Sequence, residues 1–293
     1  MRIQQPPKKK RDFDFVAFIG KGSFGVVREA VWGKMHVAVK TVTKDASCDK
    51  TLLEAEISTN MFHPNVVASY LYLVEDDPPW SLHLIQELCD GDLATAFRNR
   101  LLRNVNMDLP NYRAVLQLCR HIAGGMEYIH KRNVVHGDLN PRNVLLAVRP
   151  DALPLGAVAK VADFGMAAWL RENAVKDRRG GTPFYIAPEV LEDHMLYKAS
   201  DVYSFGVIMW EAYTGVAPFV PIVSGDRVKH IAYDGFPAMP SHTPTGYRDL
   251  VFACLAKNPD DRPSFTHIIS KLRRLRDRYK NTTNNATTSV ILA

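Results

Sequence analysis

The spacing of apolar residues changes near residue 90, and this change constrains the fold more than any other feature of the chain. Over residues 13–42, apolar and β-branched side chains often alternate with polar ones and are interrupted by glycines, which predicts three antiparallel strands. Residues 49–62 have helical spacing, and residues 66–74 and 82–88 predict two further strands. Residues 12–88 are therefore expected to form a small lobe of strands with one helix.

The rest of the chain has helical periodicity. Helices are expected at 93–102, 112–130, 198–214, 248–256 and 265–279. These elements predict a mainly helical lobe over 93–279, joined to the first lobe by residues 88–92. The Pro- and Lys-rich residues 1–11 predict a flexible basic tail, and the Asn- and Thr-rich residues 280–293 predict a disordered tail.

Composition excludes several classes of protein. Of the 293 residues, 46% are hydrophobic and 23% are charged, which rules out bulk disorder, and no apolar run reaches the roughly 18 residues needed to span a membrane. The net charge of +6 comes largely from residues 8–11 and 271–280, and no basic stripe with interleaved aromatics indicates nucleic-acid binding. The four cysteines have no C-x-x-C spacing and are expected to be free thiols in a reducing compartment. We therefore expect a cytoplasmic protein without membrane or direct nucleic-acid partners, with nuclear import through residues 7–11 as an alternative.

Gly20, Gly22 and Gly25 form a G-x-G-x-x-G pattern between the first two expected strands. Glycines let the backbone approach phosphate groups closely and point N–H groups at them. A dinucleotide-binding loop would lead from a strand into a helix, with an acidic residue about 20 positions later. Here a third strand with Val37-Ala38-Val39-Lys40 follows instead, so the context disfavours dinucleotide binding.

Four further motifs follow in order along the chain. They are HGDLNPRN at 136–143, DFG at 163–165, APE at 187–189 and DRP at 261–263. With the glycine pattern and Lys40, they resemble the motifs of eukaryotic protein kinases, over nearly the whole chain. The resemblance implies an α+β bilobal fold, with a small five-stranded N-lobe carrying one helix and a larger mainly helical C-lobe. It also implies that the chain uses ATP and Mg²⁺ to phosphorylate protein substrates.

The resemblance implies that Lys40 grips the α- and β-phosphates of ATP and that Glu54 holds Lys40 in place. Glu54 lies nine positions before His63-Pro64-Asn65, as in the family pattern. Glu56 is the alternative partner, but two positions along a helix turn it about 200° away from Glu54.

The nucleotide-binding residues implied by the resemblance come from the glycine loop, from strands and from the segment that joins the lobes. Gln86 has the gatekeeper position before that segment, and the backbone of residues 87–89 would bond adenine. The full implied set is Ile19, Gly20, Lys21, Gly22, Ser23, Phe24, Gly25, Val27, Ala38, Lys40, Gln86, Glu87, Leu88, Cys89 and Leu145.

The same resemblance assigns the catalytic loop. Asp138 would accept a hydrogen bond from the substrate hydroxyl and take its proton, and Thr182 would orient Asp138. Asn143 and Asp163 would hold magnesium, because amide and carboxylate oxygens suit a hard cation. Arg142 completes the implied catalytic set.

Two scaffold roles are also implied. Glu189 is expected to pair with Arg262, and Asp201 is expected to brace the catalytic loop from below. Loss of either interaction should damage folding as well as rate.

Gly137 departs from the family pattern, because it replaces an arginine that meets a phosphate on the activation segment. Residues 163–189 contain no serine, and only Thr182 and Tyr185 carry hydroxyl groups. We hypothesise that activity does not require phosphorylation of this segment.

The acceptor class is indicated by conflicting residues. Gly181-Thr182-Pro183-Phe184-Tyr185 resembles serine/threonine kinases, whereas Asn140 replaces their usual lysine and Arg142 has the place of an arginine found in many tyrosine kinases. We expect a serine/threonine kinase, with a tyrosine or dual-specificity kinase as the alternative.

Ser58 and Ser69 fall where the family stacks apolar side chains, which would weaken the active arrangement. This raises the alternative of a weakly active ATP-binding signalling scaffold, although Lys40, Asp138 and Asp163 are all present. A small-molecule phosphotransferase is a further alternative that the APE motif disfavours. Residues 149–156 are expected to form a longer turn than the family has, with no assigned function.

Overall fold

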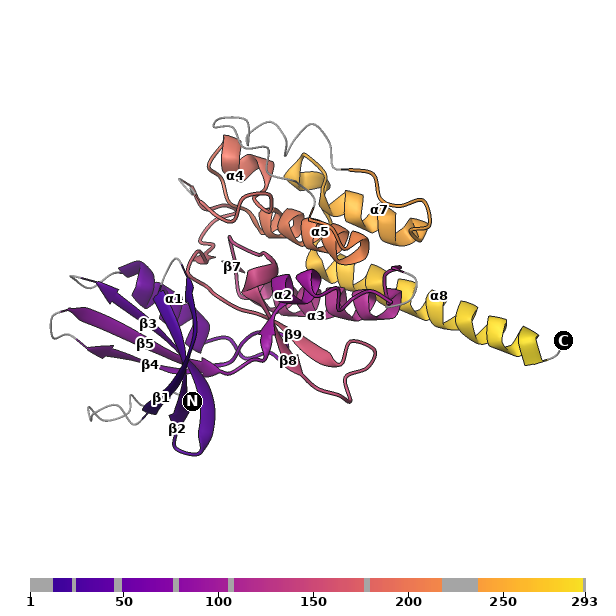
Figure 1. Cartoon of the computed structure of the whole chain (residues 1–293). Helices are drawn as coiled ribbons and strands as arrows, with labels where there is room; N and C mark the ends of the chain where they lie inside the picture. Colours follow the sequence, from indigo (N-terminus) through magenta and orange to yellow (C-terminus); the bar gives the residue numbers. More distant parts are fainter. Residues whose placement is uncertain are drawn as a thin grey trace. The chain divides into compact units, whose positions relative to one another are not determined.

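The chain consists of two compact units, described from a computed structural model. The described residues are 13–22, 25–44, 49–75, 79–104, 108–176, 180–217 and 237–291, with backbone alone over 281–291. The first unit contains residues 1–61 and 68–89, and the second contains 62–67 and 90–293 (Figure 1). The basic tail predicted at 1–11, and also Ser23, Phe24 and Cys48, lie outside the described residues.

The first unit is built on one antiparallel sheet, which confirms the five predicted strands. The sheet has the order β1-β2-β3-β5-β4. Its elements are β1 (Phe13–Gly22), β2 (Gly25–Trp32), β3 (Met35–Lys44), α1 (Asp49–Thr59), β4 (Ser69–Glu75) and β5 (Trp80–Glu87). Helix α1 ends at Thr59, earlier than the predicted residue 62. After it, the N–H groups of Asn60 and Met61 donate to the carbonyl groups of Ile57 and Ser58.

The two faces of this sheet bury different side chains, because residues alternate between faces along a strand. On one face, Val37, Val39 and Ile85 form a core cluster with Phe13. On the other face, the first turns of α1 pack Ala55 against the strand residues Leu82 and Leu84. Lys40 lies directly opposite Leu84 in the sheet and therefore shares the face that α1 covers.

The second unit is mainly helical, as predicted. Its helices are α2 (Leu93–Arg98), α3 (Tyr112–Lys131), α4 (Pro188–Glu192), α5 (Lys198–Thr214), α7 (Thr245–Cys254) and α8 (Phe265–Ile291). Helix α5 is buried over residues 200–213 and lies next to α3 and α7, so it forms the centre of this unit. No helix in the described part of the chain is both long and apolar enough to cross a membrane.

Short strands in the second unit flank the loops that contain residues 136–143 and 162–167. They are β6 (Gly91–Asp92), β7 (Val134–Val135), β8 (Val144–Val148), β9 (Ala157–Val161) and β10 (Ala168–Trp169). Most have too few residues to show a periodicity, so the sequence does not predict them. Residues 62–67 belong to this unit because Val67 and Asn65 pair with the backbone of Val161.

The turn at 149–156 joins β8 to β9 and is tied to α3 by one side chain. The Gln117 amide nitrogen donates to the Ala152 carbonyl at 3.1 Å, and the Gln117 carbonyl oxygen accepts from the Leu155 N–H at 3.1 Å. The turn therefore packs against α3.

Helix α8 runs to Ile291, through most of the tail for which the composition predicted disorder. The Asn- and Thr-rich residues have weak helix propensity, but they extend a helix already formed by 265–280. Extension adds a hydrogen bond for each residue fixed and avoids the cost of nucleation.

Helix α3 contains two adjacent glycines with different surroundings, which gives a matched pair of variants. A Cβ at Gly125 would lie 2.4 Å from the Asn65 carbonyl oxygen, whereas one at Gly124 would have its nearest neighbour at 3.4 Å. We expect Gly125→Ala to lower the free energy of unfolding by about 1–3 kcal/mol through overpacking. Gly124→Ala should leave it unchanged or raise it by up to about 1 kcal/mol. Urea unfolding of both variants checks this, and equal stabilities would contradict the close approach of Asn65 to α3.

Candidate active site

Four of the residues expected to bind nucleotide lie on one face of the first unit's sheet. Val27 pairs directly with Lys40, and Ala38 pairs directly with Gln86. Ala38 and Lys40 are two residues apart on β3, so all four side chains point from the same face of the sheet. Two small apolar side chains thus lie next to an ammonium group, an arrangement that suits an aromatic base followed by phosphates.

Lys40 and Glu54 form a buried ion pair. The distance from Lys40 Nζ to Glu54 Oε1 is 2.5 Å, and the two residues are only 8% and 6% exposed. Glu56, the alternative partner, is exposed on the outer side of α1. The pair fixes the ammonium group of β3 against α1, as a phosphate-orienting lysine requires.

The glycine pattern occupies the turn between β1 and β2. Gly22 pairs with Gly25 at the end of the two strands, and Gly20 pairs with Val27. Gly25 has φ +153°, and a Cβ there would lie 2.5 Å from the Thr41 carbonyl oxygen, so only glycine fits without a shift. Ile19 is half exposed before this turn.

The last residues of the first unit include Gln86, which was expected at the gatekeeper position. Gln86 Nε2 donates to Ser69 Oγ at 2.9 Å. Glu87 is fixed by Ala68, whose N–H donates to Glu87 Oε1 at 2.6 Å and whose carbonyl accepts from the Glu87 N–H at 2.9 Å. Leu88 and Cys89 follow and are half-buried.

In the second unit, Asp138 accepts hydrogen bonds from the side chain of Asn143 and from the backbone of Thr182. Asn143 Nδ2 donates to Asp138 Oδ2 at 3.0 Å and to its carbonyl at 2.8 Å. The Thr182 N–H donates to Asp138 Oδ1 at 2.7 Å. The structure therefore brings together three of the predicted site residues and leaves a half-buried carboxylate in a fixed orientation, as a proton acceptor needs.

Asn140 links the catalytic loop to the activation segment, a role that sequence reasoning missed. Its amide nitrogen donates to Thr182 Oγ1 at 2.9 Å and to the Asp138 carbonyl at 3.0 Å. Its amide oxygen accepts from the N–H groups of Arg142 and Asn143 and so caps the 3-10 turn Pro141–Asn143. An asparagine before a proline is a cap signal, but the sequence could not show that its other end reaches Thr182.

Asp163 lies beside the catalytic loop because the backbone of its neighbour Ala162 makes two hydrogen bonds to that loop. The Ala162 N–H donates to the Asn143 carbonyl at 2.8 Å, and the Ala162 carbonyl accepts from His136 Nε2 at 3.0 Å. Asp163 itself has φ 63°, and its Oδ1 accepts from the Gly165 N–H at 3.1 Å. The DFG segment is thus attached to the residues 136–143.

The residues proposed for magnesium fit that ion chemically. Because the Asn143 nitrogen is directed to Asp138, its amide oxygen is the group left to coordinate a cation. Asp163 offers a carboxylate, and this pair of hard oxygen ligands suits Mg²⁺, which keeps several waters and phosphate oxygens in its shell.

Arg142 and Leu145 take less direct places. The side chain of Arg142 is exposed, and the hydrogen bonds that involve this residue in the described part of the chain use its backbone N–H. Leu145 is half-buried in β8, between Asp92 of β6 and Lys160 of β9.

Asp201 braces the catalytic loop from α5. Its Oδ2 accepts from the His136 N–H and its Oδ1 from the Gly137 N–H, both at 2.9 Å. His130 Nε2 adds a contact of 2.7 Å to Oδ2. Burial alone would raise the pKa of Asp201, but the hydrogen bond from His130 and the backbone donors hold it below its ordinary value. The sequence had not indicated His130.

Ser58 and Ser69 lie in the layer between α1 and the sheet. Ser58 follows Glu54 by one helical turn and so faces the same side, and Ser69 pairs with Gln86 on the Lys40 face. Ser69 is bonded to Gln86, whereas Ser58 Oγ, in a residue 1% exposed, has no hydrogen-bond partner among the described residues.

The unpartnered Ser58 hydroxyl predicts a stabilising substitution. A buried hydroxyl without a partner costs about 1–3 kcal/mol, so Ser58→Ala should raise the free energy of unfolding by about 1 kcal/mol after the small loss of packing. Ser69→Ala, which removes a bonded hydroxyl, should lower it. Thermal unfolding of the two variants provides the comparison, and destabilisation by Ser58→Ala would show that the hydroxyl is satisfied in solution.

The end of the activation segment is anchored to α5 by a buried carboxyl group. The Tyr185 hydroxyl donates to Glu211 Oε2 at 2.6 Å. Burial raises the pKa of Glu211 to about 7, and the Tyr185 hydrogen bond offsets part of this shift.

This shift predicts a pH-dependent stability. Between about pH 4.5 and 7, the unfolded chain loses the Glu211 proton while the folded chain keeps it. The contribution of Glu211 is therefore fully present below pH 4.5 and is lost as pH rises through about 7, by on the order of 3 kcal/mol. Glu211→Gln stays neutral and should remove this component. Urea unfolding of both proteins at pH 5.5 and 7.5 measures the difference, and identical pH dependences would contradict the raised pKa.

Comparison with known proteins agrees with this geometry. A family model described as protein tyrosine and serine/threonine kinase matches residues 13–272. The chain is 29% identical to the dual specificity protein kinase zakA of Dictyostelium discoideum, over 96% of this chain and 38% of that protein. It is 30% identical to the tyrosine-protein kinase transforming protein ros of UR2 avian sarcoma virus, over 94% and 71%. It is 33% identical to the human serine/threonine-protein kinase ULK1, over 87% and 24%, so the chain spans well under half the length of two of these relatives.

Proposed function

Because the chain belongs to the protein tyrosine and serine/threonine kinase family, we propose that it transfers the γ-phosphoryl group of ATP to serine and threonine hydroxyls of protein substrates. The observation that carries the proposal is the orientation of Asp138, fixed by Asn143 and by Thr182. A carboxylate held on both sides can direct one substrate hydroxyl and accept its proton. Incubation with radiolabelled ATP and a degenerate peptide mixture tests it, and absence of labelled peptide would reject it.

The proposed mechanism relies on positioning and electrostatics. Lys40, held by Glu54, orients the α- and β-phosphates, and the backbone around Gly20, Gly22 and Gly25 covers them. Asn143 and Asp163 hold Mg²⁺, which supplies charge neutralisation at the phosphates. Asp138 aligns the acceptor hydroxyl and takes its proton as the phosphoryl group is transferred.

The contact between Asn140 and Thr182 supports the serine/threonine assignment. Asn140 Nδ2 donates to Thr182 Oγ1 at 2.9 Å. Asn140, which replaces the usual lysine of serine/threonine kinases, therefore still links the catalytic loop to Thr182 of the activation segment. Phosphoamino-acid analysis of the labelled peptides tests the assignment, since phosphotyrosine as the main product would reject it. A dual-specificity kinase is the second candidate, because zakA, a dual specificity kinase by name, matches 96% of the chain.

We further propose that activity does not depend on phosphorylation of the activation segment. Both hydroxyl groups available there are engaged: Thr182 Oγ1 accepts from Asn140, and Tyr185 donates to the buried Glu211. A phosphate on either would have to displace these contacts. Phosphatase treatment of active enzyme should leave turnover within about twofold, and abolished turnover would reject the proposal.

A further inference from the structure

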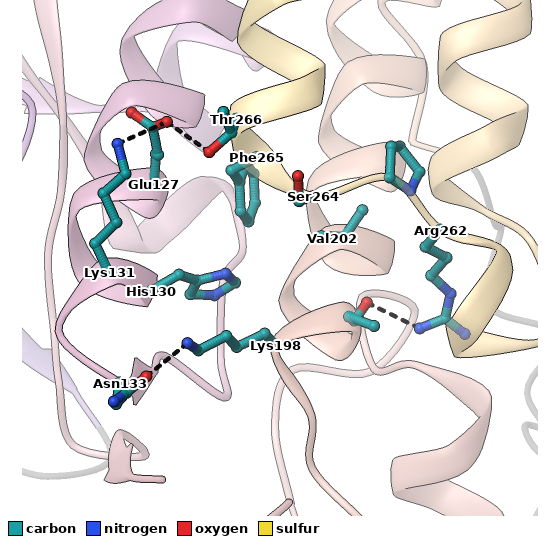
Figure 2. A pocket seen from close by; sticks show the side chains of 12 residues that line it. Glu127, His130, Lys131, Asn133, Lys198, Val202, Arg262, Ser264, Phe265 and Thr266 are labelled. Atoms are coloured by element: carbon teal, nitrogen blue, oxygen red, sulfur yellow. Dashed lines mark hydrogen bonds and ion pairs between the residues drawn. The ribbon is translucent and has the colours of Figure 1, made fainter. Parts of the chain in front are cut away.

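A cavity of about 400 Å³ opens on the second unit (Figure 2), and neither Asp138 nor Asp163 is among the residues that line it. It is lined by the end of α3 with the turn that follows, the start of α5, and residues 262–266, where α8 begins. Its volume falls within the range of about 300–1,000 Å³ found for small-molecule sites. Its apolar floor consists of Pro263, which is half-buried, and of the small exposed parts of Val202 and Phe265, which are each 2% exposed.

Most of the charged groups that line the cavity are neutralised by neighbours. Glu127 accepts from Lys131 at 3.0 Å and from Thr266 Oγ1 at 2.7 Å, as Figure 2 shows. Arg262 is bonded to both carboxylate oxygens of Glu189 at 2.8 Å. These pairs leave little net charge of either sign, so they do not select a charged ligand.

Lys198 is the exception. In the part of the chain that the structure describes it pairs with no carboxylate, and its Nζ donates to the neutral Asn133 Oδ1 at 2.8 Å. Figure 2 shows this ammonium group extending below the His130 ring. One uncompensated positive charge beside an apolar floor favours a monoanion with an apolar body, because a dianion would need further charge-assisted donors.

The cavity is also connected to the catalytic loop through one side chain. The His130 ring forms part of the wall and contacts Phe265 edge to face, with 5.0 Å between ring centroids. Its Nε2 lies 2.7 Å from Asp201 Oδ2, and the Asp201 carboxylate holds the N–H groups of His136 and Gly137. A ligand that contacts His130 thus meets the group that braces the loop before Asp138.

We propose that this cavity is a binding site for a monocarboxylate with an apolar ring or short chain. We further propose that binding there changes the surroundings of the catalytic-loop residues 136–137. The carboxylate accepts a hydrogen bond from the Lys198 ammonium group, which can keep or give up its contact with Asn133 Oδ1. The apolar part covers Pro263 and the exposed edges of Val202 and Phe265. The His130–Asp201 contact carries the effect to residues 136–137.

The test uses naphthalene-2-carboxylate as the probe and the 293-residue chain without ATP or peptide, so its result is separate from that of the proposed function. Titration followed by backbone amide NMR should show saturable shifts at residues 264–266. The neutral naphthalene-2-carboxamide should bind at least tenfold more weakly, because it lacks the charge that Lys198 selects. Equal binding of the amide would overturn the proposal.

Lysine variants locate the site. Lys198→Met should weaken carboxylate binding at least tenfold, and Lys198→Arg should keep it within about threefold. Lys271→Met is the matched control, because Lys271 is an exposed lysine of α8 that does not line the cavity, and it should bind as the wild type does. Equal losses in Lys198→Met and Lys271→Met would overturn the site. At saturation the amides of His136 and Gly137 should shift in parallel with those of 264–266, and unmoved amides would overturn the connection to the catalytic loop.

Discussion

Asp138→Asn is expected to lower the turnover number for peptide phosphorylation by about 10²–10⁴-fold while the fold remains intact. The asparagine oxygen can still accept the Thr182 N–H that now meets Asp138 Oδ1 at 2.7 Å. The amide cannot take the proton of the acceptor hydroxyl, and its nitrogen would face the Asn143 amide that now donates to Asp138 Oδ2. Steady-state kinetics with a peptide substrate, together with thermal unfolding of the same sample, measures the effect.

A matched carboxylate gives the control for this prediction. Asp151 is exposed in the turn between β8 and β9, and Asp151→Asn removes the same charge from the same unit. Its turnover should stay within about twofold of wild type. If Asp138→Asn also kept turnover within twofold, Asp138 would not be the proton acceptor, and the proposed mechanism would be wrong.

Arg262→Met is expected to have the largest effect on stability, because it breaks a buried ion pair and leaves Glu189 uncompensated. The Arg262 guanidinium donates to both Glu189 oxygens and also to the carbonyl groups of Ala199 and Ala256. Removing one partner of a buried pair costs about 3–5 kcal/mol. Urea unfolding should show this loss. Arg248→Met, at a partly exposed arginine of α7, should change stability by less than about 0.5 kcal/mol.

A double variant separates the uncompensated charge from the lost contacts. In Arg262→Met with Glu189→Leu no buried carboxylate remains, so the loss should be smaller than the sum of the two single losses. The carbonyl groups of Ala199 and Ala256 still lack their donor, so stability should not return to the wild-type value. Additive losses would show that the two side chains do not interact in the folded protein.

Local patterns predicted the architecture well, because they depend on residues close together in sequence. Alternation over 13–42 predicted strands that the structure contains as β1, β2 and β3, and helical spacing located α3 and α5 to within a residue or two. The choice of Glu54 over Glu56 rested on the family spacing before His63-Pro64-Asn65, since helix geometry shows only that the two side chains point apart. The structure directs Glu54 to Lys40.

Long-range partners could not be predicted in the same way. Asn140 and Thr182 are 42 positions apart, and His130 and Asp201 are 71 positions apart. Nothing in the local pattern of one residue indicates its partner, since the first contact joins two loops and the second joins α3 to α5. Helix α8 beyond residue 280 was missed for the opposite reason, because the composition of a short segment does not reveal that it extends a packed helix.

The most direct test of the central claim compares phosphoryl transfer by the wild type, Lys40→Met and Asp163→Ala. Each protein is incubated with radiolabelled ATP, Mg²⁺ and a degenerate peptide mixture, and label in the peptide is counted. The account predicts labelled peptide with the wild type, and a loss of at least about 10²-fold with each variant, with thermal unfolding confirming that all three are folded. Labelling by both variants at the wild-type rate would contradict it.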